Sequence, residues 1–324
     1  MTDGRRFPRT LAGLSTGSYC SAVTTARQWP EPGPLSGISL ALVGPGRVGS
    51  ALTRWAQGRG ARLEQVAGRT LSGRAAAQAG ASGAVPVALP ELSSARQTLL
   101  LIAVPDPELD GVVATLAARD QAPVVLHTSG SRDAAALASL RARGSAVGSL
   151  HPLRAFADPA AEPLPGGFYA VDGDPEAQAL AFRLTAAWDG VAAVVPATAR
   201  RLYHFGATLA AGGVVTLVSA AADLAGRAGL PPEVARGYLA LAQSALDQAA
   251  RGETPRAALT GPVLRGEREL VLAQLAELRQ LRPELAALAT HLARETLLQA
   301  GAAAPLDAAQ QALLEALAEA ENMT

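Results

Sequence analysis

The sequence has no lysine, one cysteine and one asparagine, and these absences limit its chemistry. Because every basic side chain is an arginine, Schiff-base chemistry and acid–base catalysis by lysine are excluded. Cys20 is the only cysteine, which excludes a disulfide framework and a cysteine-ligated metal cluster and is consistent with the cytoplasm. The formal net charge is zero, so nucleic acid and anionic membranes are not indicated as main partners. No metal-ligand motif is evident.

The character of the chain changes near Pro196, and its length allows about two domains. Residues 1–36 are rich in Gly, Ser, Thr, Pro and Arg without periodicity, which predicts a disordered tail rather than a targeting signal. Residues 37–196 alternate short apolar runs with helical patterns. Residues 197–301 are Ala- and Leu-rich, which predicts a helical domain for dimerisation or substrate binding, and residues 302–324 form a further helix or tail.

The alternation of strands and helices predicts an α/β fold with a Rossmann doubly wound, mainly parallel sheet, followed by an all-α second domain. Strands are predicted at 38–43, 63–67, 98–104, 124–126, 146–150, 168–171 and 192–195, with helices at 48–57 and 175–188. In the second domain, helices are predicted at 198–226, 231–251, 267–278, 283–299 and 306–320. The uncharged stretch 205–222 is long enough to span a membrane, but its Ala, Gly and Thr content favours a buried central helix.

A glycine-rich turn follows the first predicted strand directly and opens a helix. Its sequence is Gly44-Pro45-Gly46-Arg47-Val48-Gly49. Gly44 allows a tight turn, Gly46 allows the backbone to approach a diphosphate, and Gly49 allows the helix to pack closely on the strand. Free N–H groups at the helix start then receive phosphate. Glycine loops also serve as plain turns, but the strand–loop–helix context favours dinucleotide binding.

The end of the second predicted strand favours NADP over NAD. The sequence there is Val66-Ala67-Gly68-Arg69-Thr70, with no carboxylate to hold a ribose 2′-hydroxyl. Arg69 could hold a 2′-phosphate, with hydroxyl donors from Thr70 and Ser72. Alternatively, Arg69 is a solvated loop residue.

The segment Val104-Pro105-Asp106 is expected to lie beside the nicotinamide ribose, because it ends a later strand of the same sheet. It can equally be a strand stop followed by a helix cap, and both interpretations can hold together.

Two histidines lie at predicted strand ends, where open parallel sheets bind ligands. His127 precedes Thr128-Ser129-Gly130, and His151 follows a later strand. Histidine is suited to proton transfer near neutral pH, so His151 is the candidate acid or base, with Ser129 as a substrate or amide contact. Tyr203 and His204 open the long apolar helix and are candidate cleft partners, although helix capping and packing explain them equally well. His291 is expected to be a surface or packing residue.

These motifs together resemble a family that pairs a Rossmann-like NADP-binding domain with a C-terminal helical domain of unknown function. The resemblance spans about residues 38–300 and rests on these motifs: Gly44–Gly49, Val104–Asp106, His127–Gly130, Gly148–Pro152, Tyr203-His204, and Ala258–Pro262 with Arg265-Gly266. The family is related to pyrroline-5-carboxylate reductase, prephenate dehydrogenase and deazaflavin-dependent NADP reductase. The resemblance implies an NADP-dependent oxidoreductase acting on a small molecule, and a homodimer formed through the helical domain.

The chain departs from this family in one place. Relatives usually carry Ser-Asn about eight residues after the helix histidine, where this chain has Ala211-Gly212. Two hypotheses remain open. The first is hydride transfer between NADP and a small carbonyl, imine or alcohol. The second is a non-catalytic NADP(H)-binding sensor or assembly module, and a weaker third is a flavin or sugar-nucleotide binder.

Overall fold

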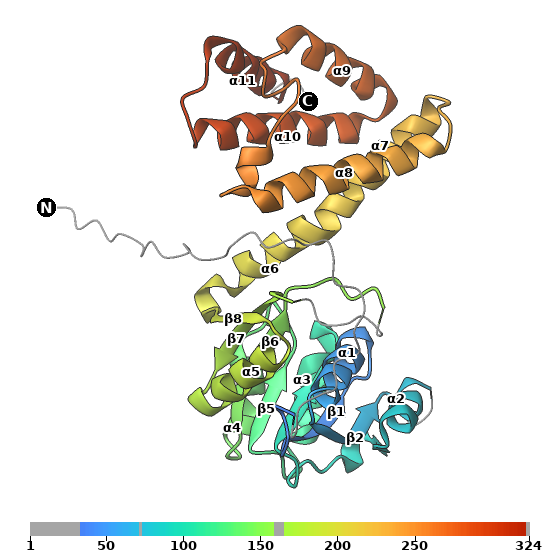
Figure 1. The fold of residues 1–324 in the computed structure, drawn as a ribbon, viewed down its shortest axis with the longest axis vertical. Coiled ribbons are helices and arrows are strands. Elements are labelled where there is room, and N and C mark those ends of the chain that lie inside the picture. The colour runs from blue at the N-terminus through green and yellow to red at the C-terminus, as the bar shows by residue number, and fades with distance from the viewer. Residues whose placement is uncertain (1–32, 71–72, 159–164, 322–324) are drawn as a thin grey trace, which may run out of the picture. The chain divides into compact units, whose positions relative to one another are not determined.

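The computed structural model describes residues 33–70, 73–158 and 165–321 (Figure 1). These residues fall into two compact units that divide between Val215 and Thr216. The first unit contains the sheet and the glycine-rich turn, and the second contains helices only. The predicted domain boundary at Pro196 and the predicted tail at residues 1–36 stay predictions, and residues 1–32 lie outside the described part of the chain.

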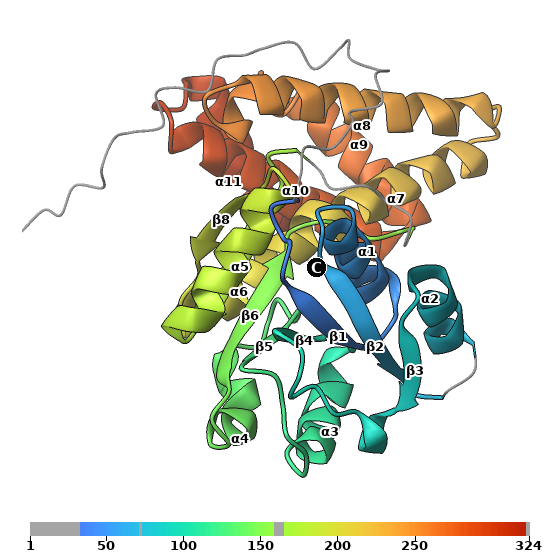
Figure 2. The ribbon, with the colours of Figure 1, turned by 60° about the horizontal axis from the view of Figure 1, so that its bottom comes forward.

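The first unit is built on an eight-stranded sheet with the order β3-β2-β1-β4-β5-β6-β7-β8 (Figure 2). The first six strands are parallel in the order 3-2-1-4-5-6, which is the Rossmann arrangement. Strand β7 runs antiparallel to β6, and β8 runs parallel to β7. The strands are β1 Ser39–Val43, β2 Arg62–Gly68, β3 Val85–Ala88, β4 Leu99–Ile102, β5 Val124–His127, β6 Ala146–Pro152, β7 Phe168–Gly173 and β8 Val191–Val194.

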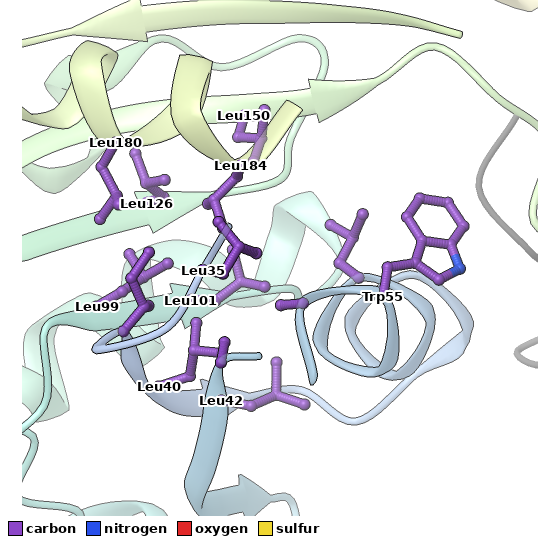
Figure 3. Close-up of a cluster of buried hydrophobic side chains, with 14 of the residues drawn as sticks. Leu35, Leu40, Leu42, Trp55, Leu99, Leu101, Leu126, Leu150, Leu180 and Leu184 are labelled. Atoms are coloured by element: carbon purple, nitrogen blue, oxygen red, sulfur yellow. The ribbon is translucent and has the colours of Figure 1, made fainter. Parts of the chain in front are cut away.

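Helices cover both faces of this sheet, as the sequence predicted. In β1, Leu40 and Leu42 point into one buried cluster, while Ala41 and Val43 point into the other, as the two-residue period of a strand requires. The first cluster includes side chains of α1 (Arg47–Gln57) and α5 (Pro175–Ala187), as Figure 3 shows, and side chains of α2 (Arg74–Ser82) as well. The second includes side chains of α3 (Asp106–Leu116) and α4 (Ala138–Arg141).

Several elements were not predicted because their sequences lack clear periodicity. Strand β3 contains Pro86, and Val85 is 59% exposed at the sheet edge, so the strand shows no buried apolar run. Helix α2 is rich in Ala and Gly and buries only Ala75 and Ala79. Both elements form because the parallel sheet continues past β2, which is a tertiary effect.

The second unit has a small core formed by its last helices. Helices α9 (Arg268–Leu281), α10 (Pro283–Gly301) and α11 (Ala308–Glu321) pack together around Leu275, Leu297 and Leu317. Helix α8 (Glu233–Arg251) precedes them and has no buried residue. The chain enters this unit through one helical segment that consists of α6 (Arg200–Thr208), a π-helical turn (Leu209–Gly213) and α7 (Val214–Arg227).

The expectation of a buried central helix at 205–222 is wrong for the single chain. Phe205, Leu209 and Val215 are 59%, 57% and 66% exposed, because little of the described chain packs on this segment. By length and hydropathy the helical segment Ala197–Arg227 could cross a membrane, although such a helix alone is weak evidence for doing so. An exposed apolar surface of this kind is typical of a site that binds another protein or a membrane.

Gly49 offers a direct test of the close packing between α1 and the sheet. A Cβ at this position would overlap the Gly44 carbonyl oxygen and lie 3.0 Å from Leu42 Cδ1. We expect Gly49→Ala to lower the free energy of unfolding by about 1–3 kcal/mol, measured by urea denaturation. Gly80→Ala in α2 is the matched control, since open space surrounds it, and should be neutral or stabilising by about 0.5–1 kcal/mol. Equal stabilities for the two variants would contradict this packing.

Candidate functional site

The glycine-rich turn leaves the backbone accessible where β1 meets α1. Gly44 has φ +89°, and a Cβ there would lie 2.5 Å from the Ala103 carbonyl oxygen, so only glycine fits. In contrast, a Cβ on Gly46 would meet nothing within 4 Å. No side chain caps the first turn of α1, and no acidic residue lies in it. The start of α1 therefore presents uncapped N–H groups to open space, which is the requirement for binding a diphosphate.

Two cavities adjoin this turn and share part of their walls. One has a volume of about 770 Å³ and is lined by the ends of β1 and β2 and by residues after β3. The other has a volume of about 480 Å³ and extends to the ends of β5 and β6. Gly46, Val104 and Pro105 line both. An elongated ligand could therefore lie across the turn with one end in each cavity, which is the shape of a dinucleotide.

The larger cavity contains the residues that were expected to select the cofactor. Arg69 and Thr70 both line it. The Arg69 guanidinium, however, lies 2.5 Å from the Glu108 carboxylate, and its side chain is 83% exposed. Ser72 lies outside the described residues. Arg69 is thus close to the expected position, but it is already neutralised by a carboxylate.

The smaller cavity brings together the other predicted residues. Val104, Pro105, Asp106, Thr128 and Ser129 line it, as do Arg47, Val48, His151 and His204. The Asp106 carboxylate accepts a hydrogen bond from Ser131 Oγ at 2.5 Å, so it is held by the loop after β5. Strand β4 ends before this segment and α3 begins at Asp106, so the segment is a strand end followed by a helix start, while its position beside a nicotinamide ribose stays a prediction.

His151, Tyr203 and His204 form one group at this cavity. His151 Nδ1 lies 2.7 Å from the Tyr203 hydroxyl oxygen, although the two residues are far apart in the sequence. The rings of His151 and His204 pack edge-on with centroids 5.9 Å apart. His151 of β6 therefore lies beside Tyr203 and His204 of α6, at the edge of the sheet where open parallel sheets bind ligands.

Gly130 allows the two histidines to lie this close, a role that no local sequence pattern indicates. A Cβ on Gly130 would lie 2.6 Å from His204 Nδ1 and 2.7 Å from His151 Nε2. Both ring nitrogens therefore face the same small space above this glycine. His204 Nδ1 is buried and has no hydrogen-bond partner in the part of the chain that the structure describes. A buried nitrogen of this kind is costly unless a ligand or water satisfies it.

His127 is structural, unlike its neighbour His151. Its side chain is fully buried, Nδ1 accepts the Ser129 N–H at 3.2 Å, and Nε2 donates to the Asp133 carbonyl at 2.9 Å. Both ring nitrogens are thus satisfied by the backbone, which fixes a neutral tautomer. The ring shapes the loop that carries Thr128 and Ser129 rather than facing a ligand.

Arg200 is the main site residue that the sequence analysis missed. It is 1% exposed and donates to the Ser129 carbonyl at 3.3 Å and to Ser149 Oγ. Among the described residues no carboxylate lies within ion-pair distance of it. Desolvation lowers the pKa of this guanidinium, and only the more distant Asp172 and Asp133 favour its charge, together with Tyr203. An arginine at a helix start ordinarily indicates a solvated residue, so no sequence signal distinguishes it.

His151 and Tyr203 are both neutral at physiological pH. Burial is the largest cause that lowers the pKa of His151 from 6.5 to about 4, followed by the charges of His204 and Arg200. Burial also raises the pKa of Tyr203 from 10.0 to about 12, so its hydroxyl keeps its proton. A neutral imidazole can therefore give or take a proton at Nε2 while the Tyr203 hydroxyl is its hydrogen-bond partner at Nδ1.

Two family models match the chain. A Rossmann-like domain model matches residues 34–152, and a model of a domain of unknown function, DUF2520, matches residues 168–320. The chain is therefore similar to a Rossmann-like domain over its first part and to a DUF2520 domain over its second, which confirms the resemblance seen in the sequence motifs. No curated protein matches the chain.

Solved structures share this architecture over nearly their whole length. A candidate NADP oxidoreductase from Bacteroides fragilis is 20% identical, with a TM-score of 0.64 over 81% of this chain and 98% of its own. A protein from Thermotoga maritima is 21% identical, with a TM-score of 0.64 over 87% and 99%. The pyrroline carboxylate reductase of Plasmodium falciparum, solved with NADP bound, is 13% identical, with a TM-score of 0.53 over 80% and 96%. These likenesses establish the fold.

The departure from the family at Ala211-Gly212 lies within the π-helical turn of the long helix. Such turns are rare and often occur at functional sites, because they widen the helix by one residue. Both residues are exposed in the single chain. The chain therefore differs from the family at a point where the helix backbone is irregular.

Because His127 is buried and neutral, we expect the folded protein to lose stability in acid. Burial is the main cause that lowers its pKa from 6.5 to about 4. Between these values the unfolded chain binds a proton that the folded chain does not, so the free energy of unfolding falls as the pH drops from 6.5 to 4. His127 alone should contribute about 2–3 kcal/mol of this fall between pH 7 and 4.5.

Urea denaturation at pH 7 and 4.5 measures this effect. His127→Gln should reduce the difference between the two stabilities, because it removes the titrating ring and keeps a donor for Asp133. Val85→Gln is the control, since Val85 is 59% exposed at the sheet edge and does not titrate, and it should leave the difference unchanged. If His127→Gln shows the full acid sensitivity of the unaltered chain, His127 does not carry this effect.

Proposed function

We propose that the protein is an NADP-dependent oxidoreductase that transfers hydride to or from a small carbonyl, imine or alcohol. The observation that carries this proposal is the open glycine turn, which lies between two cavities and has a neutral His151–Tyr203 pair in one of them. The NADP bound to the Plasmodium reductase of the same fold supports the choice of cofactor.

The residues present fit a nicotinamide dinucleotide. The uncapped N–H groups after Gly46 would receive the diphosphate, and the larger cavity beside Arg69 and Thr70 would hold the adenosine. Val104, Pro105 and Asp106 would lie along the nicotinamide half in the smaller cavity. When bound, the nicotinamide supplies or takes the hydride, and the protein has to orient the substrate and handle the proton.

The His151–Tyr203 pair can handle that proton in both directions. If the Tyr203 hydroxyl donates to His151 Nδ1, the proton of the neutral ring lies on Nε2. As this proton passes to a carbonyl oxygen or imine nitrogen, the Tyr203 proton passes to Nδ1, and the resulting tyrosinate takes a proton from water. In the reverse direction His151 Nδ1 donates to the Tyr203 oxygen, Nε2 accepts the proton of an alcohol, and the imidazolium so formed releases its proton to water. His204 Nδ1 faces the same space, which supports a second contact to the same substrate atom.

Substitution of His151 tests this role. His151→Ala should lower the turnover number by about 10²–10⁴-fold, as loss of a general acid or base does, while the affinity for NADPH stays unchanged. Tyr203→Phe should cause a smaller loss, because the ring of His151 remains. Turnover is measured by NADPH oxidation in a screen of ketoacids, imines and deazaflavins, and NADPH affinity by fluorescence titration.

The outcomes of this experiment separate the alternatives. Arg201→Ala is the control for substitutions near the site, since Arg201 neighbours Arg200 but is exposed. Normal turnover in His151→Ala would remove His151 from the mechanism. Tight NADPH binding with no oxidation of any candidate substrate would favour a non-catalytic sensor, an alternative that the Ala211-Gly212 departure supports. Binding of a flavin or sugar nucleotide in place of NADPH would overturn the choice of cofactor.

We further propose that the protein is a cytoplasmic homodimer joined through its helices. The exposed apolar side chains lie not only on the uncharged segment 205–222 but also on α8, where Leu239, Leu241 and Leu246 are 50%, 67% and 52% exposed. Helix α8 also carries Arg236, Asp247 and Arg251, and such charges suit a protein partner better than a lipid phase. A second copy offers the same apolar surface, as a two-fold interface requires.

Mass measurement by size exclusion with light scattering tests the dimer. The protein should have twice the mass of its 32.9 kDa chain, and Leu241→Glu should shift it towards the monomer. Val85→Glu is the control, because Val85 is similarly exposed but lies on the sheet edge. A monomeric wild-type chain would contradict the dimer, as would a chain that is recovered only with lipid vesicles.

A further inference from the structure

We propose that Arg47 and Arg74 hold the 2′-phosphate of NADP(H) in a basic pocket between α1 and α2, and that Arg69 does not. This inference rests on the proposed function, since it concerns the cofactor of that same site. It assigns the distinction between NADP and NAD to Arg47 and Arg74, whereas the sequence pattern favours Arg69.

A third cavity of about 580 Å³ forms this basic pocket. Its lining includes Arg47 and Arg54 of α1, Arg74 of α2, and the polar side chains of Ser50 and Gln78. Among the described residues, no aspartate or glutamate lines it. Arg47 and Arg74 therefore place two positive charges at this cavity, and this charge fits a phosphate group.

The pocket lies next to the place where an adenosine ribose would be. It shares Pro45, Gly46 and Arg74 with the larger cavity, which holds the end of β2. A Cβ on Gly68 would lie 3.1 Å from Ala75 Cβ and 3.6 Å from Pro45 Cδ. The end of β2 is thus packed closely between the glycine turn and the start of α2. A group on the ribose 2′-position at the end of β2 therefore has Arg74 as a near neighbour.

Arg69 is poorly suited to this role for an electrostatic reason. Its guanidinium is paired with Glu108 at 2.5 Å, and Glu108 itself lines the larger cavity. A phosphate bound at Arg69 would lie beside this carboxylate, and the repulsion would offset much of the attraction. By contrast, neither Arg47 nor Arg74 makes an ion pair within the residues that the structure describes. Arg74 lines the larger cavity together with Glu108, but Arg47 and Arg74 also line the basic pocket, which Glu108 does not line.

Binding measurements on the full chain test this assignment without any substrate. The dissociation constants of NADPH and NADH are measured by fluorescence titration for Arg74→Gln and, as the matched control, Arg69→Gln. We expect Arg74→Gln to weaken NADPH about 10–100-fold, the effect of losing a charge-assisted hydrogen bond, and to leave NADH within about threefold. Arg69→Gln should change both affinities by less than about threefold. Arg47→Gln should weaken NADPH more than NADH.

A fragment of the cofactor gives a second readout. Adenosine 2′,5′-bisphosphate should compete with NADPH more strongly than 5′-AMP does in the unaltered protein, and Arg74→Gln should remove that advantage. Circular dichroism checks the fold of each variant, and Arg74 is an exposed residue whose loss should leave it intact.

The outcomes distinguish this inference from the function on which it rests. If Arg69→Gln loses NADPH affinity and Arg74→Gln does not, the basic pocket is not the phosphate site. Equal affinities of the unaltered protein for NADPH and NADH would also overturn this inference, while leaving dinucleotide binding in place. If the unaltered protein binds neither dinucleotide, the proposed function itself fails.

Discussion

A buried arginine without a carboxylate partner connects the parts of the candidate site. Arg200 begins α6 and donates to the Ser129 carbonyl after β5 and to Ser149 in β6, so one side chain ties a helix to two strands. Burying a cation is costly, and these polar contacts offset only part of that cost. The cost is consistent with a functional role, because the same contacts place Tyr203 and His204 one turn further along α6, opposite His151.

Charged and neutral polar side chains lie at different ends of the ligand-binding edge of the sheet. At the glycine turn, Arg47 and Arg74 line open pockets and make no ion pair within the described residues, which suits the phosphates of a dinucleotide. Around Gly130, burial and the Arg200 charge keep His151 neutral. One end of the edge thus carries arginines that suit an anion, and the other end carries a neutral histidine. A pyridine nucleotide reductase needs both properties within the length of its cofactor.

The fold was largely predictable, and the site only in part. The strands around 38–43 and 98–104 are continuous apolar runs, which a strand buried on both faces requires, so sequence alone revealed them. The glycine turn was also visible, because its spacing reflects local backbone geometry. The roles of Gly130 and Arg200 were not visible, since each depends on side chains that are distant in the sequence. The exposure of 205–222 was mispredicted, because an apolar pattern does not reveal whether its partner lies in the same chain.

Local patterns of the sequence therefore determined the order of strands and helices, the turn between β1 and α1, and the residues at the ends of β5 and β6. Only the tertiary structure decided that His127 is satisfied by the backbone while His151 faces a cavity, and that Arg69 is paired with Glu108 while Arg74 is not. The physical reason is that hydrogen bonding and periodicity act between near neighbours in the chain. Burial and charge pairing depend on which distant segments the folded sheet brings together.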